Sequence, residues 1–119
     1  MDHQPLRGQK ALVTGANSGI GEGIARALGV AGASVVVNYV SKPEVAAGIV
    51  DDIRGNGVDA LAIRADVSRE AEVEAMFAAV EKDWGGIDIL VNNAGLQRDA
   101  PFTEMTLEQW NTVLGVNLT

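Results

Sequence analysis

Glycines crowd the segment 14–21, which reads Thr-Gly-Ala-Asn-Ser-Gly-Ile-Gly. Gly15 would let the chain turn sharply off a strand, and Gly19 and Gly21 would let backbone approach a phosphate and pack a helix closely on a sheet. The free N–H groups and the dipole at the start of that helix would favour a pyrophosphate. The spacing differs from the Gly-x-Gly-x-x-Gly fingerprint and lacks the Gly-Lys-Ser/Thr of a P-loop. A glycine-rich turn without a ligand is the alternative.

Polar side chains also follow two later apolar runs. The tetrad 92–95, Asn-Asn-Ala-Gly, comes directly after the run 87–91. Ligands of an open parallel sheet bind outside the carboxyl ends of its strands, so the two amides could line a ligand cleft. They could equally be ordinary turn residues. Asp66 follows the run 61–63, where its carboxylate could accept a hydrogen bond from an adenine amino group or solvate a loop before a helix cap at Ser68.

The residues after the second β-prone run bear on which dinucleotide would bind. An acidic residue there would bind a ribose 2′-hydroxyl and favour NAD, whereas a 2′-phosphate needs a positive or neutral donor. The segment 38–42 reads Asn-Tyr-Val-Ser-Lys, with no carboxylate before Glu44. Ser41 and Lys42 could bind a phosphate, which favours NADP. Lys42 could instead be an exposed residue at a helix start, and use of both cofactors stays open.

The hydrophobic pattern predicts the strands and helices that would position these residues. Apolar β-prone runs at 10–14, 35–39, 61–63 and 87–91 predict strands, and apolar residues between them recur at helical spacing. The helical stripes are Ile20, Ile24, Ala27, Leu28 and Ala31, then Val45, Ile49 and Ile53, then Val73, Met76, Phe77, Val80 and Trp84. This alternation predicts a Rossmann-like, doubly wound parallel α/β sheet of four strands, with a fourth helix starting after a capping box at Thr106–Gln109.

The composition limits the classes of function. Of 119 residues 47% are hydrophobic, yet no apolar stretch approaches the roughly 20 residues of a membrane helix, and residues 1–5 lack the pattern of a secretory signal. With no cysteine there is no thiol catalysis or thiolate metal site, and the only histidine, His3, lies in a polar tail. A net charge of −7 argues against nucleic acids and anionic membranes as partners. We expect a cytoplasmic protein of one domain without a metal.

Together, these motifs resemble the short-chain dehydrogenase/reductase family. The resemblance rests on the turn 14–21, Asp66-Val67, the tetrad 92–95 and Trp110-x2-Val113-x3-Asn117, and it spans essentially the whole chain. It implies an oxidoreductase that transfers a hydride between a nicotinamide cofactor, NADP or NAD, and an alcohol or carbonyl substrate.

The resemblance also implies a role for each matching position. The residues expected to bind the cofactor are Gly15, Asn17, Ser18, Gly19, Ile20 and Gly21 at the pyrophosphate, Asn38, Tyr39 and Ser41 after the second strand, Asp66 and Val67 at the adenine, and Asn93, Ala94 and Gly95 at the ribose. Asn117 matches the family's catalytic asparagine, which helps hold a water in a proton relay beside the active-site lysine.

Finer features look like bacterial glucose 1-dehydrogenases. They are the segments 37–39, 93–96 and 104–107, the last leading to Trp110-Asn111. The 3-oxoacyl-carrier-protein reductases share most of this pattern and are the alternative. Val40 stands where relatives with a better phosphate clamp carry an arginine.

The family's catalytic serine and Tyr-x-x-x-Lys motif lie beyond the asparagine. This sequence ends two residues after Asn117, and its only tyrosine, Tyr39, is followed four residues later by Pro43. Residues 1–119 are therefore expected to be the N-terminal, NAD(P)-binding half of a larger single domain, without efficient turnover alone. A non-catalytic dinucleotide-binding module or truncated product is the alternative. Family members are commonly tetramers, so the full-length form is expected to be a homo-oligomer.

Overall fold

Four parallel strands form one sheet in the computed structural model, which describes residues 4–93. The elements follow one another as β1 (Lys10–Val13), α1 (Gly19–Val30), β2 (Ser34–Tyr39), α2 (Pro43–Arg54), β3 (Ala60–Arg64), α3 (Glu70–Trp84) and β4 (Ile89–Val91). The strand order is β3-β2-β1-β4, so the chain crosses the sheet between β3 and β4. This is the Rossmann-like, doubly wound arrangement that the sequence predicted. The helix predicted after Thr106 lies outside the described residues.

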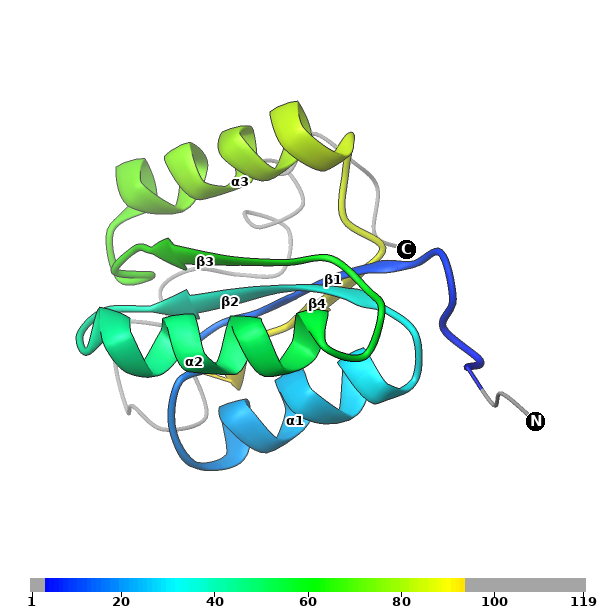
Figure 1. Cartoon of the computed structure of the whole chain (residues 1–119). Helices are drawn as coiled ribbons and strands as arrows, with labels where there is room; N and C mark the ends of the chain where they lie inside the picture. The colour runs from blue at the N-terminus through cyan, green and yellow to red at the C-terminus, as the bar shows by residue number, and fades with distance from the viewer. Residues whose placement is uncertain (1–3, 94–119) are drawn as a thin grey trace.

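Helices cover both faces of the sheet (Figure 1). On one face α3 packs against Leu12 of β1 and Val36 of β2. On the other face α1 and α2 pack against Val13, Val35 and Val37. The side chains of these five residues are fully buried. The two central strands are therefore apolar on both sides, which explains their continuous rather than alternating apolar sequence.

The apolar stripe predicted for α3 is confirmed, and that of α2 needs a correction. The buried residues of α3 are Val73, Met76, Phe77 and Val80, with Trp84 partly buried beside them. In α2, Val45 is 37% exposed, while Ala46 and Val50 join the buried face. Each helix is apolar mainly on its sheet side, and within residues 4–93 none is long and apolar enough to cross a membrane.

Small residues occupy the fully buried positions of α1, which corrects the predicted stripe in part. Ile24 and Leu28 are partly buried and pack against the core, as the stripe predicted. Gly21, Ala25 and Gly29 are buried, whereas Ile20 is 64% exposed. The physical reason is close packing between helices, because a Cβ on Gly29 would lie only 2.9 Å from Cγ2 of Ile53 in α2. Larger side chains on this face would hold α1 away from the sheet and from α2.

The start of α3 also differs from the prediction of a cap at Ser68. The helix begins at Glu70, with Arg69 in the N-cap position. The Ser68 hydroxyl donates instead to Oδ1 of Asp66 at 2.6 Å, and the Ser68 N–H donates to the same oxygen at 3.0 Å. The Ser68 hydroxyl is therefore bound to the Asp66 carboxylate and does not cap the helix. Short polar side chains commonly form such local hydrogen bonds in place of a helix cap.

Arg26 connects the two helices that share a face. Its Nε donates to Oε2 of Glu22 at 2.9 Å, and its Nη1 donates to Oδ2 of Asp52 in α2 at 2.7 Å. The hydrogen bonds to Asp52 and Glu22 raise the pKa of Arg26 above its ordinary value. The guanidinium therefore stays charged at every pH at which the protein would be studied.

Candidate functional site

The residues that the sequence singled out gather at one edge of the sheet. The glycine-rich turn follows β1, Asn38 and Tyr39 end β2, Asp66 lies two residues after β3, and Asn93 lies two residues after β4. Because all four strands are parallel, their carboxyl ends meet at this edge. β1 and β4 are neighbours here, which makes it the position at which open α/β sheets bind ligands.

The turn after β1 requires glycine at defined positions. Gly15 and Gly19 have φ angles of 58° and 54°, in the left-handed region that favours glycine. Gly21 requires glycine for a different reason. A Cβ at Gly21 would collide with the backbone carbonyl of Gly15 and with Nδ2 of Asn93. The first turn of α1 therefore packs directly against the turn and the end of β4.

The N-terminus of α1 is open. Ser18 occupies the N-cap position in an extended conformation and makes no side-chain cap bond. Ser18, Gly19 and Ile20 are exposed. The first N–H groups of a helix have no partner within it, and the helix dipole adds a partial positive charge there. With no side-chain cap on these groups, the arrangement suits a phosphate or another anion.

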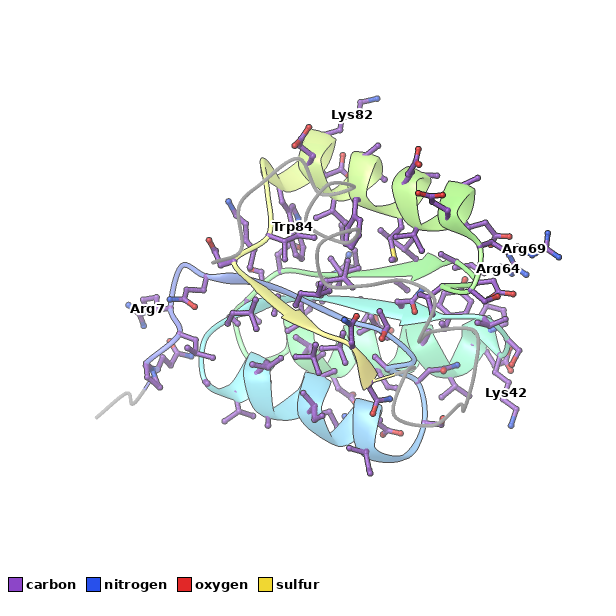
Figure 2. The ribbon with its side chains drawn as sticks, turned by 180° about the vertical axis from the view of Figure 1, so that it is seen from behind. Arg7, Lys42, Arg64, Arg69, Lys82 and Trp84 are labelled. Atoms are coloured by element: carbon purple, nitrogen blue, oxygen red, sulfur yellow. The ribbon has the colours of Figure 1, made fainter. Side chains whose placement is uncertain are left out.

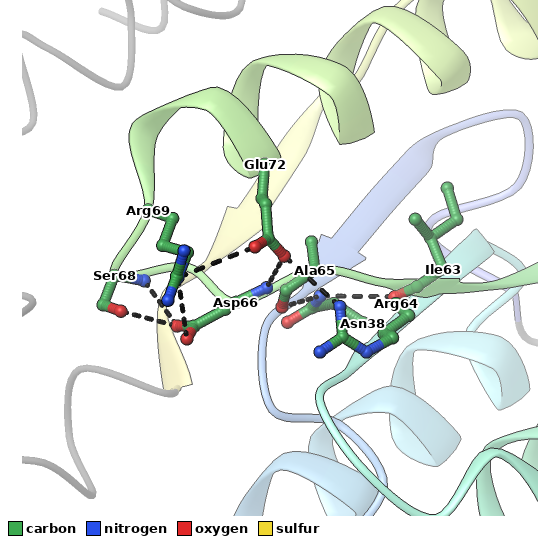
Figure 3. Close-up of polar contacts among 8 residues, drawn as sticks. All are labelled: Asn38, Ile63, Arg64, Ala65, Asp66, Ser68, Arg69 and Glu72. Carbon is green, nitrogen blue, oxygen red and sulfur yellow. Dashed lines mark hydrogen bonds and ion pairs between the residues drawn. The ribbon is translucent and has the colours of Figure 1, made fainter.

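Asn38 lies inside the protein rather than on the open edge. Its side chain is 1% exposed. Oδ1 accepts from the N–H of Gly15 at 3.1 Å, and Nδ2 donates to the carbonyls of Ala65 at 3.1 Å and Ile63 at 3.3 Å (Figure 3). The side chain thus holds protein backbone, and the direct cofactor contact expected of it remains a prediction.

Asn93 joins β4 to the glycine-rich turn. It is fully buried, and its Nδ2 donates to the carbonyl of Gly15 at 3.1 Å. Among residues 4–93, no hydrogen-bond partner is found for the buried Oδ1 of Asn93 or of its neighbour Asn92. The carbonyl and N–H of Gly15 are therefore both held by asparagine side chains, that of Asn93 after β4 and that of Asn38 in β2.

Asp66 lies in a dense polar network at the start of the β3–α3 loop (Figure 3). Its Oδ1 accepts the two bonds from Ser68, and its Oδ2 lies 3.9 Å from Nε of Arg69. Its backbone N–H donates to Oε1 of Glu72 at 2.8 Å. Val67, the other residue expected at the adenine, is buried. These contacts hold the start of the loop, which lies beside the end of β2 because the Ala65 N–H donates to the carbonyl of Tyr39 at 3.0 Å.

The β2–α2 loop is attached to the turn by Asn17. Nδ2 of Asn17 donates to the carbonyl of Ser41 at 2.7 Å and to that of Lys42 at 3.4 Å. Lys42 has a φ of 60°, an uncommon conformation for a residue other than glycine. Ser41 and Lys42 are exposed, whereas Tyr39 is half-buried.

Positive side chains lie in and beside this loop in the described part of the chain. Figure 2 shows Lys42, Arg64 and Arg69 on one side of the molecule, away from Arg7 and Lys82. Arg64 ends β3 and pairs in register with Tyr39 of β2. The edge of this acidic chain therefore carries positive side chains beside the end of β2, although the two arginines also lie 3.4 and 3.8 Å from carboxylate oxygens of Glu72.

Sequence reasoning missed the structural roles of Glu72 and Asn38. Glu72 was not among the expected site residues, yet its carboxylate accepts from the backbone N–H of Asp66. Its position three residues after the N-cap was the available signal, because a glutamate there commonly reaches back to a preceding N–H. Nothing in the local pattern revealed the inward orientation of Asn38. Ala94, Gly95 and Asn117 lie outside the described residues.

A family model described as short chain dehydrogenase matches residues 9–119. The chain belongs to the short-chain dehydrogenase family. Among curated members it is 44% identical over 110 residues to a 3-oxoacyl-[acyl-carrier-protein] reductase of Staphylococcus aureus, covering 92% of this chain and 45% of that protein. It is 42% identical over 114 residues to a D-beta-hydroxybutyrate dehydrogenase of Cupriavidus necator, covering 96% of this chain and 44% of that protein. The chain thus spans about half the length of these relatives.

Solved structures of short-chain dehydrogenases share the fold. A hydroxysteroid dehydrogenase from Escherichia coli superposes with a TM-score of 0.79 at 31% identity, covering 95% of this chain and 53% of that one. A 7α-hydroxysteroid dehydrogenase solved with NADH and a 7-oxo bile acid gives a TM-score of 0.78 at 29% identity, covering 95% of this chain and 49% of that one. These matches confirm both the family and the fold that the sequence indicated.

Proposed function

We propose that this chain forms the dinucleotide-binding site of an NAD(P)-dependent oxidoreductase. The observation that carries the proposal is the open N-terminus of α1, whose first turn packs on Gly15 and Asn93 with no room for a side chain at Gly21. A member of this family with an uncapped helix N-terminus at the switch point of its sheet has the geometry to hold a pyrophosphate.

The remaining roles are those that the family resemblance implies for the matching positions. The N–H groups at the start of α1 bind the pyrophosphate, with Asn17 holding the adjacent loop. Asp66 and Val67 flank the adenine, and Asn93, Ala94 and Gly95 flank the ribose nearer the reacting centre. Asn117 orders a water for proton transfer. The nicotinamide, when bound, supplies the hydride chemistry, and the protein supplies orientation.

Calorimetric titration of the chain with NADP⁺ and with NAD⁺ tests this proposal. We expect at least one of them to bind with a Kd between about 1 μM and 1 mM, the range in which enzymes commonly hold small substrates. Binding of neither dinucleotide to the folded chain would contradict the proposal. The same chain mixed with cofactor and substrate, followed by the absorbance of the reduced cofactor, separates an enzyme from a binding module without turnover.

We further propose a preference for NADP, with Ser41 and Lys42 as the groups that bind the 2′-phosphate. Lys42→Asn removes the charge and keeps a residue that tolerates positive φ. We expect this change to raise the Kd for NADP⁺ about 3–10-fold, because one partly exposed charged contact is lost, and to leave the Kd for NAD⁺ unchanged.

The matched control for Lys42 is Lys82→Gln in the last turn of α3, which removes an exposed lysine far from this loop. It should change neither Kd. Equal effects of Lys42→Asn on both dinucleotides would show that Lys42 is only an exposed residue at a helix start, and the preference for NADP would then be wrong.

Two substrate classes remain candidates for the whole protein. The 44% identity to a 3-oxoacyl-[acyl-carrier-protein] reductase supports a 3-oxoacyl thioester. The segments 37–39 and 104–107 support glucose through their likeness to glucose 1-dehydrogenases. Reduction of a β-ketoacyl thioester without oxidation of glucose would favour the first class, and the reverse would favour the second.

A further inference from the structure

Asn38 holds both N–H groups at the base of the glycine-rich turn. Its side-chain Oδ1 accepts from Gly15, and its backbone carbonyl accepts from the N–H of Ala16 at 2.8 Å. These two N–H groups are therefore committed to the protein. A phosphate must bind farther along, at the N–H groups of the first turn of α1, whose distance from β2 is set by Asn38.

The same side chain also holds the other end of the site. Nδ2 of Asn38 donates to the carbonyl of Ala65, and the N–H of the same peptide unit, that of Asp66, donates to Oε1 of Glu72. One peptide is thus fixed from both sides, by Asn38 from β2 and by Glu72 from α3 (Figure 3). The direction in which the Asp66 side chain leaves the backbone depends on this peptide.

We infer that Asn38 is a positioning residue that sets the spacing between the pyrophosphate-binding turn and the adenine-binding loop. Its amide joins Gly15 to Ala65 through one rigid, buried group. A ligand that contacts both ends binds with higher affinity when they are held at the correct separation. Once its first half is bound, its second half meets its own site without a further loss of translational freedom. A ligand that occupies only one end gains nothing from the spacing. This inference rests on the proposed function, because the spanning ligand is the dinucleotide.

An amide is required because Asn38 must donate and accept at once. An aspartate would still accept from Gly15, but it would direct a carboxylate oxygen at the carbonyls of Ala65 and Ile63 inside the protein. An alanine would leave the Gly15 N–H and the Ala65 carbonyl without this partner. Both changes break the side-chain link between the turn and the loop, while the backbone carbonyl of residue 38 keeps its bond to the Ala16 N–H. A direct contact of the Asn38 side chain with the ligand is the competing role, and probes that occupy only one end distinguish it from positioning.

The test compares three probes on wild type and Asn38→Ala. They are NADP⁺, or NAD⁺ if that binds more tightly, inorganic pyrophosphate and adenosine, which carries no phosphate, with the weak affinities measured by NMR titration. We expect Asn38→Ala to raise the dinucleotide Kd at least about tenfold and to change the Kd of pyrophosphate and of adenosine by less than about threefold. Asn56→Ala, an exposed asparagine in the turn after α2, is the control and should change none of them.

If Asn38→Ala prevents folding, substitutions of Glu72 provide a second form of the same test. Glu72→Ala removes the second support of the Asp66 peptide, and Glu72→Gln keeps an oxygen that can accept from the Asp66 N–H. We expect Glu72→Ala to raise the dinucleotide Kd about threefold or more, and Glu72→Gln to restore it. If Asn38 and Glu72 served only stability, these variants would have a lower melting temperature, but the Kd of the dinucleotide would not rise more than the Kd values of the smaller probes.

The outcomes separate the inference from the proposed function. Failure of the wild-type chain to bind either dinucleotide would contradict both. If the wild type binds and Asn38→Ala weakens adenosine as much as the dinucleotide, Asn38 touches the ligand directly and the positioning role is wrong. Unchanged affinity for all three probes in folded Asn38→Ala would also overturn it.

Discussion

Replacing Gly21 by alanine is expected to weaken dinucleotide binding at least about tenfold and to lower the free energy of unfolding by about 1–3 kcal/mol. The added methyl group would collide with the Gly15 carbonyl and with Nδ2 of Asn93. Both atoms belong to groups that are hydrogen-bonded to each other, so neither can move away freely. The helix start must shift, and the N–H groups proposed to bind phosphate shift with it. Calorimetry and thermal denaturation measure the two effects.

Gly23 provides the matched control for Gly21. It lies two residues farther along α1, and a Cβ there would meet nothing within 4 Å. Gly23→Ala should therefore leave binding unchanged and raise the free energy of unfolding by about 0.5–1 kcal/mol, since alanine favours a helix. Gly21→Ala that binds as tightly as wild type would show that close approach of the helix to the turn is unnecessary for binding.

Leu12→Ala is expected to cost about 2.7–5.0 kcal/mol of stability, the range found for removal of buried leucines. Leu12 lies in a central strand, is fully buried and packs in the cluster beneath α3. A chain of this size has a total stability of only about 5–15 kcal/mol, so the melting temperature should fall by about 10 °C or more. The folded molecules should still bind dinucleotide, and ligand at about 100 times its Kd should recover about 2.7 kcal/mol.

Val30→Ala removes a comparable apolar side chain from the surface. Val30 is the last residue of α1 and is 63% exposed. Its replacement should change stability by no more than about 0.5 kcal/mol. A loss of less than about 1 kcal/mol for Leu12→Ala in chemical denaturation would contradict the assignment of β1 to the centre of the core.

The sheet and α3 could be predicted from the sequence because large apolar residues mark them. The stripe of Val73, Met76, Phe77 and Val80 recurs at helical spacing, and the continuous runs of β1 and β2 indicate strands buried on both faces. The same reasoning was only partly right for α1, since it looks for the largest apolar side chains. Ile24 and Leu28 pack on the core, but the fully buried positions hold glycine and alanine, because the close contact of Gly29 with Ile53 excludes a larger side chain, and Ile20 is exposed.

The positions of the candidate site followed from motif and topology, whereas its internal bonds did not. The carboxyl ends of parallel strands must meet at one edge, which brought Gly15, Asp66 and Asn93 together. The inward amide of Asn38 depends on contacts with residues more than twenty positions away, after β1 and after β3. No local spacing encodes such contacts. The local pattern also did not show that the Ser68 hydroxyl would bond to Asp66, where a helix cap was expected.

Titration of ¹⁵N-labelled chain with NADP⁺, followed by amide chemical shifts, tests the central claim most directly. The account predicts that the amides of Gly19, Ile20 and Gly21 move most, together with those of Asp66 and Val67. Gly57 and Gly85 lie in loops at the opposite ends of the strands and should stay unmoved. Shifts confined to Gly57 and Gly85, or no shifts at saturating NADP⁺ and NAD⁺, would contradict a dinucleotide site at the start of α1.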